Sequence, residues 1–263
     1  MDIFAMPSLT QGVVAALCGG FVSFSLGLVG GGGSILAVPL ILYVVGLKDP
    51  HLVIGTSALA VATNAYINLI PHARAGRVRW RAAFSFAASG VIGAAIGSSI
   101  GKLVDGHSLL IYFALLMCFV AFLMLRPKAA HAPGQTLSPG AHPRLWGTGL
   151  GAGGLSGFFG IGGGFLIVPG LMFAGPMPIA EAIGTSLFAV GSFGLTTAIN
   201  YALTSQVDWT IAIEFVAGGV IGGWLGARAA GHLANKRGAL NRIFAGMIVL
   251  VALYMLYQSL HAR

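Results

Sequence analysis

The chain reads Val29-Gly30-Gly31-Gly32-Gly33-Ser34-Ile35-Leu36-Ala37-Val38-Pro39 and returns later to Phe159-Gly160-Ile161-Gly162-Gly163-Gly164-Phe165-Leu166-Ile167-Val168-Pro169. Between Gly30 and Pro39, six of ten positions are identical in the second copy, at an offset of 130 residues. Each copy interrupts an apolar run with a backbone too rich in glycine for an ordinary helix. Inside a bilayer, such a break is tolerated only where protein or a water-filled cavity satisfies the freed N–H and C=O groups. Two breaks at matching positions of a duplicated chain indicate the binding site of a membrane transporter.

The composition predicts an integral membrane protein. Of 263 residues, 57% are hydrophobic and only 8% are charged, whereas soluble domains carry roughly 25% charged residues. The mean hydropathy is +0.90. Residues 1–28 open with Asp2 and lack a clear small-residue cleavage site, so they do not read as a signal peptide.

The basic net charge of +8 does not predict a nucleic-acid partner. The lysines and arginines lie in loops between apolar segments, which is the distribution of topology determinants. Cys18 and Cys118 are isolated in apolar runs and read as core fillers, without a disulfide or metal framework. The sequence has no nucleophile elbow, P-loop or His-Glu-x-x-His motif and no pair of deep carboxylates. We therefore expect no enzyme activity, no cofactor and no ATP-driven transport.

Apolar runs divide the chain into ten segments, in two sets of five. The first set covers residues 9–28, 34–46, 51–70, 80–101 and 109–125, and the second covers 145–159, 163–175, 179–203, 209–231 and 240–260. The segment after each break has only 13 residues, against the roughly 20 that a membrane helix needs. We predict an all-α membrane protein with broken or short helices at both glycine motifs. Residues 1–126 would form one repeat, 127–144 a cytoplasmic linker, and 145–263 the second repeat.

The internal match continues well beyond the glycine motif. Gly55-Thr56-Ser57 returns as Gly184-Thr185-Ser186, and Gly90-Val91-Ile92-Gly93 returns as Gly219-Val220-Ile221-Gly222, now at an offset of 129 residues. The duplication therefore covers nearly the whole chain.

Loop charges predict that the two repeats are inverted. Five segments are an odd number, so the second repeat should enter the membrane from the opposite side. Residues 72–81 carry four arginines, whereas the equivalent loop 204–209 carries no lysine or arginine. Placing the arginine-rich loops and the linker in the cytoplasm leaves only Lys48, Lys102 and Arg263 outside, of 14 lysines and arginines. This arrangement satisfies the positive-inside rule with both termini external.

The glycine breaks are the first candidates for an anion site. Helix N-termini carry free N–H donors and roughly half a positive charge. We predict one cradle at Gly32, Gly33 and Ser34 and its mirror image at Gly162, Gly163 and Gly164. The alternative is that these glycines only allow close packing of helices.

Polar side chains at membrane depth are the second group of candidates. The hydroxyls of Thr56, Ser57, Thr185 and Ser186 are potential donors to an oxyanion, or they bond back to carbonyls of their own helices. The Asn64 amide either lines a path or joins helices. Glu181 and Glu214 lie near the ends of segments, where snorkelling or local pairing explains them.

The glycine break ending in Val-Pro, followed by Gly-Thr-Ser and duplicated in order, resembles the TauE/SafE family of bacterial anion exporters. The resemblance extends from residue 9 to about residue 260. It implies an inner-membrane carrier that moves sulfite, sulfonates such as sulfoacetate, or related organosulfur anions outward. A coupling ion, proton or sodium, would accompany such a carrier, and oligomerisation stays open. The repeats differ at Gly31 against Ile161 and at Ser34 against Gly164, so the two cradles would contribute unequally.

We therefore predict a secondary transporter of small anions that works by alternating access at the interface between the repeats. Two other functions fit the same sequence. One is a passive anion channel, and the other is a membrane factor that assembles another complex without transport.

Overall fold

The computed structural model describes residues 9–125, 141–162, 164–175, 177–232 and 237–261, and all regular structure in these residues is helical. The helices are α1 (Leu9–Val29), η1 (Gly30–Leu36), α2 (Ala37–Pro39), η2 (Leu40–Val45), α3 (Pro50–Arg74), α4 (Trp80–Gly101), α5 (Gly106–Leu125), α6 (Ala141–Phe159), α7 (Gly164–Ala174), α8 (Ile179–Ala202), α9 (Trp209–His232) and α10 (Arg237–His261). With η1, α2 and η2 counted as one broken segment, they match the ten predicted segments. The all-α class is confirmed, while most of the predicted linker lies outside the described residues.

Five of the described helices are long and apolar enough to cross a membrane, namely α1, α3, α4, α8 and α9. Their outer faces carry large apolar side chains, such as Phe84, Ile213 and Trp224, that remain more than half exposed. An apolar surface of this extent is unfavourable in water and suited to lipid. The fold is therefore that of a multi-pass membrane protein.

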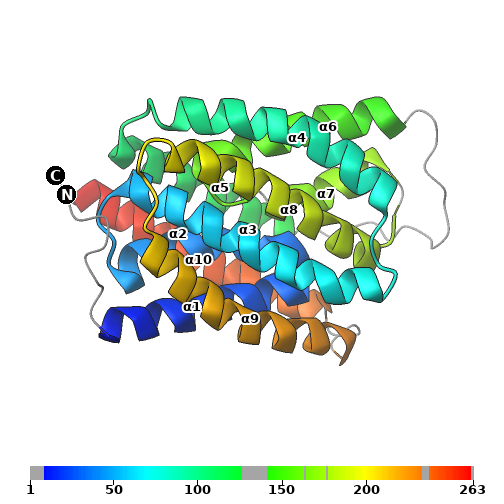
Figure 1. The fold of residues 1–263 in the computed structure, drawn as a ribbon, viewed down its shortest axis with the longest axis horizontal. Coiled ribbons are helices and arrows are strands. Elements are labelled where there is room, and N and C mark those ends of the chain that lie inside the picture. Colours follow the sequence, from blue (N-terminus) through cyan, green and yellow to red (C-terminus); the bar gives the residue numbers. More distant parts are fainter. Residues whose placement is uncertain (1–8, 126–140, 163, 176, 233–236, 262–263) are drawn as a thin grey trace.

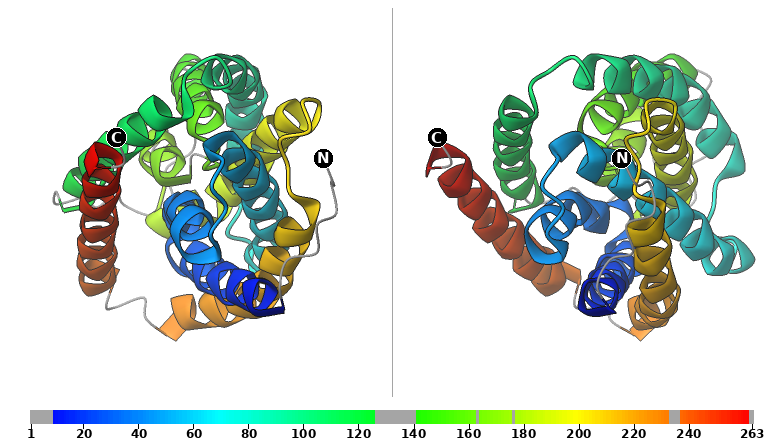
Figure 2. Two further views of the ribbon diagram at one scale, coloured as in Figure 1. Left: turned by 90° about the vertical axis from the view of Figure 1, so that its left-hand side faces the viewer. Right: turned by 60° about the vertical axis from the view of Figure 1, so that its left-hand side comes forward.

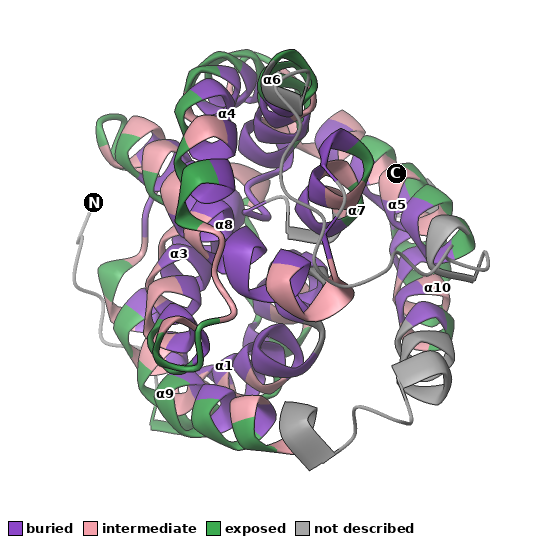
Figure 3. Cartoon of the chain, turned by 90° about the vertical axis from the view of Figure 1, so that its right-hand side faces the viewer, coloured by how far each residue is buried: buried purple, intermediate pink, exposed green. Residues whose placement is uncertain are grey.

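The long helices run side by side in a fixed order (Figure 1). α4 lies beside α6 at one edge and α1 beside α9 at the other, with α8 and α3 between the two pairs. α5 pairs with α10 at one side of the bundle (Figure 2). α3 and α8 are the most enclosed, since 72% of the apolar stretch of each is buried (Figure 3). The centre of the protein is therefore the contact between α3 and α8.

Glycine allows the two outer helix pairs to come into backbone contact. In the α1–α9 pair, a Cβ at Gly222 would overlap the Gly20 carbonyl. In the α4–α6 pair, a Cβ at Gly97 would overlap the Gly154 carbonyl. Glycine at spacings of about four residues has this role in membrane helices, so this part of the glycine content is structural.

Candidate functional site

The second glycine break lies at the centre of the protein. After α6 ends at Phe159, Gly160 and Gly162 take φ values of +67° and +65°, which disfavour residues with a Cβ. A Cβ on Gly162 would lie 2.9 Å from Cγ1 of Val190 and 3.0 Å from Cγ1 of Val61. Both valines are fully buried, one on α8 and one on α3. The backbone therefore opens between the two central helices, just before α7 begins.

α7 starts at Gly164, so its N-terminus lies inside the protein next to this break. The first four N–H groups of a helix have no partner within the helix. Gly163, which the sequence placed in the cradle, lies outside the described residues. Residues 145–175 contain no charged side chain. Any anion held here would meet backbone donors and a helix dipole rather than a lysine or an arginine.

The first glycine break has a different local structure. Gly30 takes a φ of +76°, and the chain then continues as η1, a 3-10 helix that includes Gly32, Gly33 and Ser34. It runs through α2 into η2, a π-helical turn. η1 packs against α7, so the two breaks are neighbours, and Ser34 is fully buried. The motif therefore produces a rewound helix in one half and an open backbone in the other.

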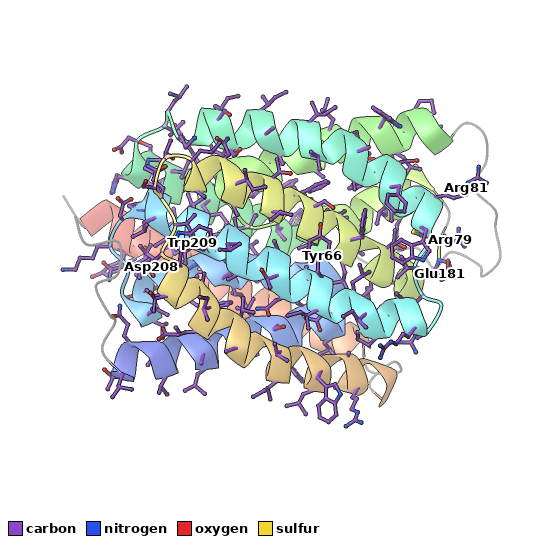
Figure 4. All side chains as sticks on the ribbon, viewed as in Figure 1. Tyr66, Arg79, Arg81, Glu181, Asp208 and Trp209 are labelled. Carbon is purple, nitrogen blue, oxygen red and sulfur yellow. The ribbon has the colours of Figure 1, made fainter. Side chains whose placement is uncertain are left out.

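The two predicted threonines hold loops at opposite ends of the protein. The Asp208 N–H donates to Thr56 Oγ1 over 2.9 Å, and Thr56 Oγ1 donates to the Leu52 carbonyl over 2.6 Å. The Arg79 N–H donates to Thr185 Oγ1 over 3.0 Å. Figure 4 shows Arg79 and Asp208 at opposite ends. Thr56 and Thr185 are therefore not brought together in this conformation.

The two predicted serines lie beside the breaks. Ser57 Oγ is 3.0 Å from the Ile54 carbonyl and 3.2 Å from the Gly160 carbonyl, so it links α3 to the start of the second break. Ser186 Oγ donates to the Ile183 carbonyl over 2.8 Å. Ile183 in turn packs on Gly30, whose Cβ would lie 3.0 Å from Ile183 Cγ2. Each serine therefore supports one break, with its proton directed at a carbonyl.

Asn64 is fully buried on α3 and faces Gly219 of α9. Neither its amide nitrogen nor its amide oxygen has a hydrogen-bond partner among the described residues. One turn later, Asn68 donates to Ser23 Oγ of α1 and to the Asn64 carbonyl, each over 2.9 Å. The structure thus directs Asn64 towards α9, and Asn68 joins the same polar group.

An ion pair that the sequence did not predict joins α4 to α8. Arg79 Nε donates to Glu181 Oε2, and the two side chains are 22% and 31% exposed. The local pairing expected for Glu181 is therefore present, but its partner lies 102 residues away. Figure 4 shows the pair at the end of the bundle that carries the arginine-rich loop. The described residues contain no group of three or more His, Cys, Asp or Glu side chains placed to hold a metal.

A family model described as "Sulfite exporter TauE/SafE" matches residues 15–255. The chain belongs to the TauE/SafE family. Two proteins of Xylella fastidiosa named "Probable membrane transporter protein" are similar to it. The one from strain 9a5c is 52% identical over 94% of this chain and 95% of its own length. YunE of Bacillus subtilis, also named a probable membrane transporter protein, is 26% identical over 94% of this chain and 97% of its own length.

No solved structure matches the chain. As a member of the TauE/SafE family with several long apolar helices, the protein belongs among multi-pass membrane transporters.

Proposed function

We propose that the protein is a secondary transporter that exports small anions across a bacterial inner membrane, and that its substrates are sulfite, sulfonates such as sulfoacetate, or related organosulfur anions. The observation that carries the proposal is the N-terminus of α7, which begins beside an open glycine backbone between α3 and α8. A buried helix start offers unpaired N–H donors to an anion. The description of the family as sulfite exporters supports the choice of sulfur oxyanions.

The proposal includes two inverted five-segment repeats. Matching contacts support it: a Cβ at Gly55 would overlap the Gln206 carbonyl, and a Cβ at Gly184 would overlap the Arg77 carbonyl. Both residues of the second contact correspond to the first at an offset of 129. These two contacts involve the loops that lie at opposite ends of the bundle (Figure 4). Inverted repeats of this kind are a common framework for alternating access.

In the proposed mechanism, backbone N–H groups hold the anion and side chains shape the backbone. The donors are those of Gly162, Gly163 and Gly164 and, to a lesser degree, those of Gly32, Gly33 and Ser34 within η1. Ser57 and Ser186 orient the two breaks, whereas Thr56 and Thr185 hold the loops that close the ends. Residues 9–47 and 145–175 carry no fixed charge. Partial charges alone bind an anion weakly enough for release.

The transport cycle would alternately release the two loops. The Thr185–Arg79 contact and the Arg79–Glu181 pair would open towards the cytoplasm, and the Thr56–Asp208 contact would open outward. Export would draw on the membrane potential or on a proton or sodium gradient, with both termini on the external side.

Counterflow in proteoliposomes tests this function. We expect uptake of labelled sulfite to saturate and to be accelerated by unlabelled sulfite trapped inside, because a carrier returns faster when loaded. Sulfoacetate should compete, and liposomes without protein should show neither effect. Flux that rises linearly with concentration and lacks counterflow would instead indicate an anion channel. No flux with any anion would favour an assembly factor.

A further inference from the structure

A group of buried amides lies where α3 meets α1 and α9. We call it the amide seam, and it consists of Asn64 and Asn68 of α3, Ser23 and Gly27 of α1, and Gly219 and Gly223 of α9. Asn64 is 0% and Asn68 is 1% exposed. The seam is therefore closed to solvent in this conformation.

The hydrogen bonds of the seam are incomplete. Asn68 Nδ2 uses its two N–H groups on Ser23 Oγ and on the Asn64 carbonyl. Asn68 Oδ1, Asn64 Oδ1 and Asn64 Nδ2 have no partner among the described residues. A buried polar group without a partner loses its hydration and gains nothing in return. Such groups persist in proteins where they serve water, an ion or a ligand in another state.

Glycine on the facing helices brings backbone against the amides. A Cβ at Gly219 would overlap the Asn64 amide, and a Cβ at Gly27 would lie 3.0 Å from Asn68 Oδ1. A side chain on either glycine would separate the helices at this level. The seam is therefore a thin contact between α3 and two glycine surfaces.

The other half of the chain builds the same contact without buried unpaired groups. At an offset of 129, Asn64 corresponds to Phe193 and Asn68 to Thr197, both on α8. Phe193 stacks on Phe86 with ring centroids 6.0 Å apart. Thr197 Oγ1 donates to the Phe193 carbonyl over 2.9 Å. Packing of this fold therefore does not require amides here, and their cost points to a role.

We propose that the amide seam opens to water during transport and forms the substrate path on the α3 side, where the unused N–H groups of Asn64 bind oxygen atoms of the anion. α1 and α3 carry no carboxylate, and that of α9, Glu214, lies near its start against Gly12. Without a carboxylate, the seam suits an oxyanion better than a cation. Water completes Asn68 Oδ1 when the seam is open. The proposal rests on the transport function above but assigns the path to one half only.

Thiol accessibility in detergent-purified protein tests the path. In a background of Cys18→Ser and Cys118→Ser, single cysteines replace Asn64, Asn68, Ser23 or, as the matched control, Thr197. We expect a charged methanethiosulfonate reagent to modify the three seam cysteines at least tenfold faster than the Thr197→Cys variant. Ser23→Cys is nearly isosteric and keeps the test open if an amide variant does not fold. Equal and slow labelling of the seam and control cysteines would overturn the path.

Flux tests recognition by Asn64. We expect Asn64→Ala to raise the KM for sulfite at least tenfold, while Thr197→Val, its control in the other half, leaves KM unchanged. An unchanged KM in Asn64→Ala would overturn recognition by this amide. Labelling needs no transported anion, so a wild-type protein without flux would contradict the transport function while the labelling contrast still decides whether the seam opens.

Discussion

At the scale of single residues, Gly162 is the position where the proposed site tolerates least change. Its φ of +65° costs a residue with a Cβ about 1–2 kcal/mol, and the added Cβ would press on Val61 and Val190. We expect Gly162→Ala to lower the unfolding temperature in detergent and to abolish flux. Gly147 is the control, because nothing lies within 4 Å of its Cβ position in α6. Gly147→Ala should leave both properties unchanged, and a Gly162→Ala variant with normal flux would remove the second break from the mechanism.

At the scale of elements, two contacts connect the loop before α4 to α8, and they should contribute unequally to stability. Thr185→Val leaves the Arg79 N–H without its partner, at a cost of about 1–3 kcal/mol. Glu181→Gln removes a partly exposed ion pair worth about 0–1 kcal/mol. We expect thermal unfolding in detergent to show the larger loss for Thr185→Val. The loss for Glu181→Gln should disappear in 1 M salt, where such pairs are screened. The reverse order would mean that the ion pair, not the hydroxyl, holds the loop.

The helical elements followed from apolar length, but several of their ends and contacts did not. α3 continues through Pro71 to Arg74 because a proline late in a helix loses little when few turns follow it. The two glycine motifs predicted equal breaks, yet η1 is wound as a 3-10 helix whose Gly33 packs on Ser25 of α1. The partner of Glu181 is remote in sequence, so no local pattern could predict it. Asn64 was predicted as a site residue, whereas the contrast with Phe193 that gives it meaning required the packing of both halves.

At the scale of the whole molecule, the contacts of one half return in the other at opposite ends of the bundle. α1 lies on α9 as α6 lies on α4, and α3 and α8 meet in the centre. If the halves are inverted, a residue and its counterpart 129 positions later must face opposite sides of the membrane. Ala75, in the arginine-rich loop, and Thr204, in the loop before α9, form such a pair, and both are exposed.

Labelling of this pair in intact cells would therefore decide the topology. In the cysteine-free background, we expect Thr204→Cys to react with a membrane-impermeant maleimide from outside. Ala75→Cys should react only after the membrane is made permeable. The positive-inside rule gives the same assignment, because four arginines lie at residues 72–81 and no lysine or arginine at 204–209. Leu103, which is 86% exposed in the loop before α5, provides a second external position. Reaction of both Ala75→Cys and Thr204→Cys from one side would mean parallel repeats, and the substrate path would then have to be sought without a two-fold axis in the membrane plane.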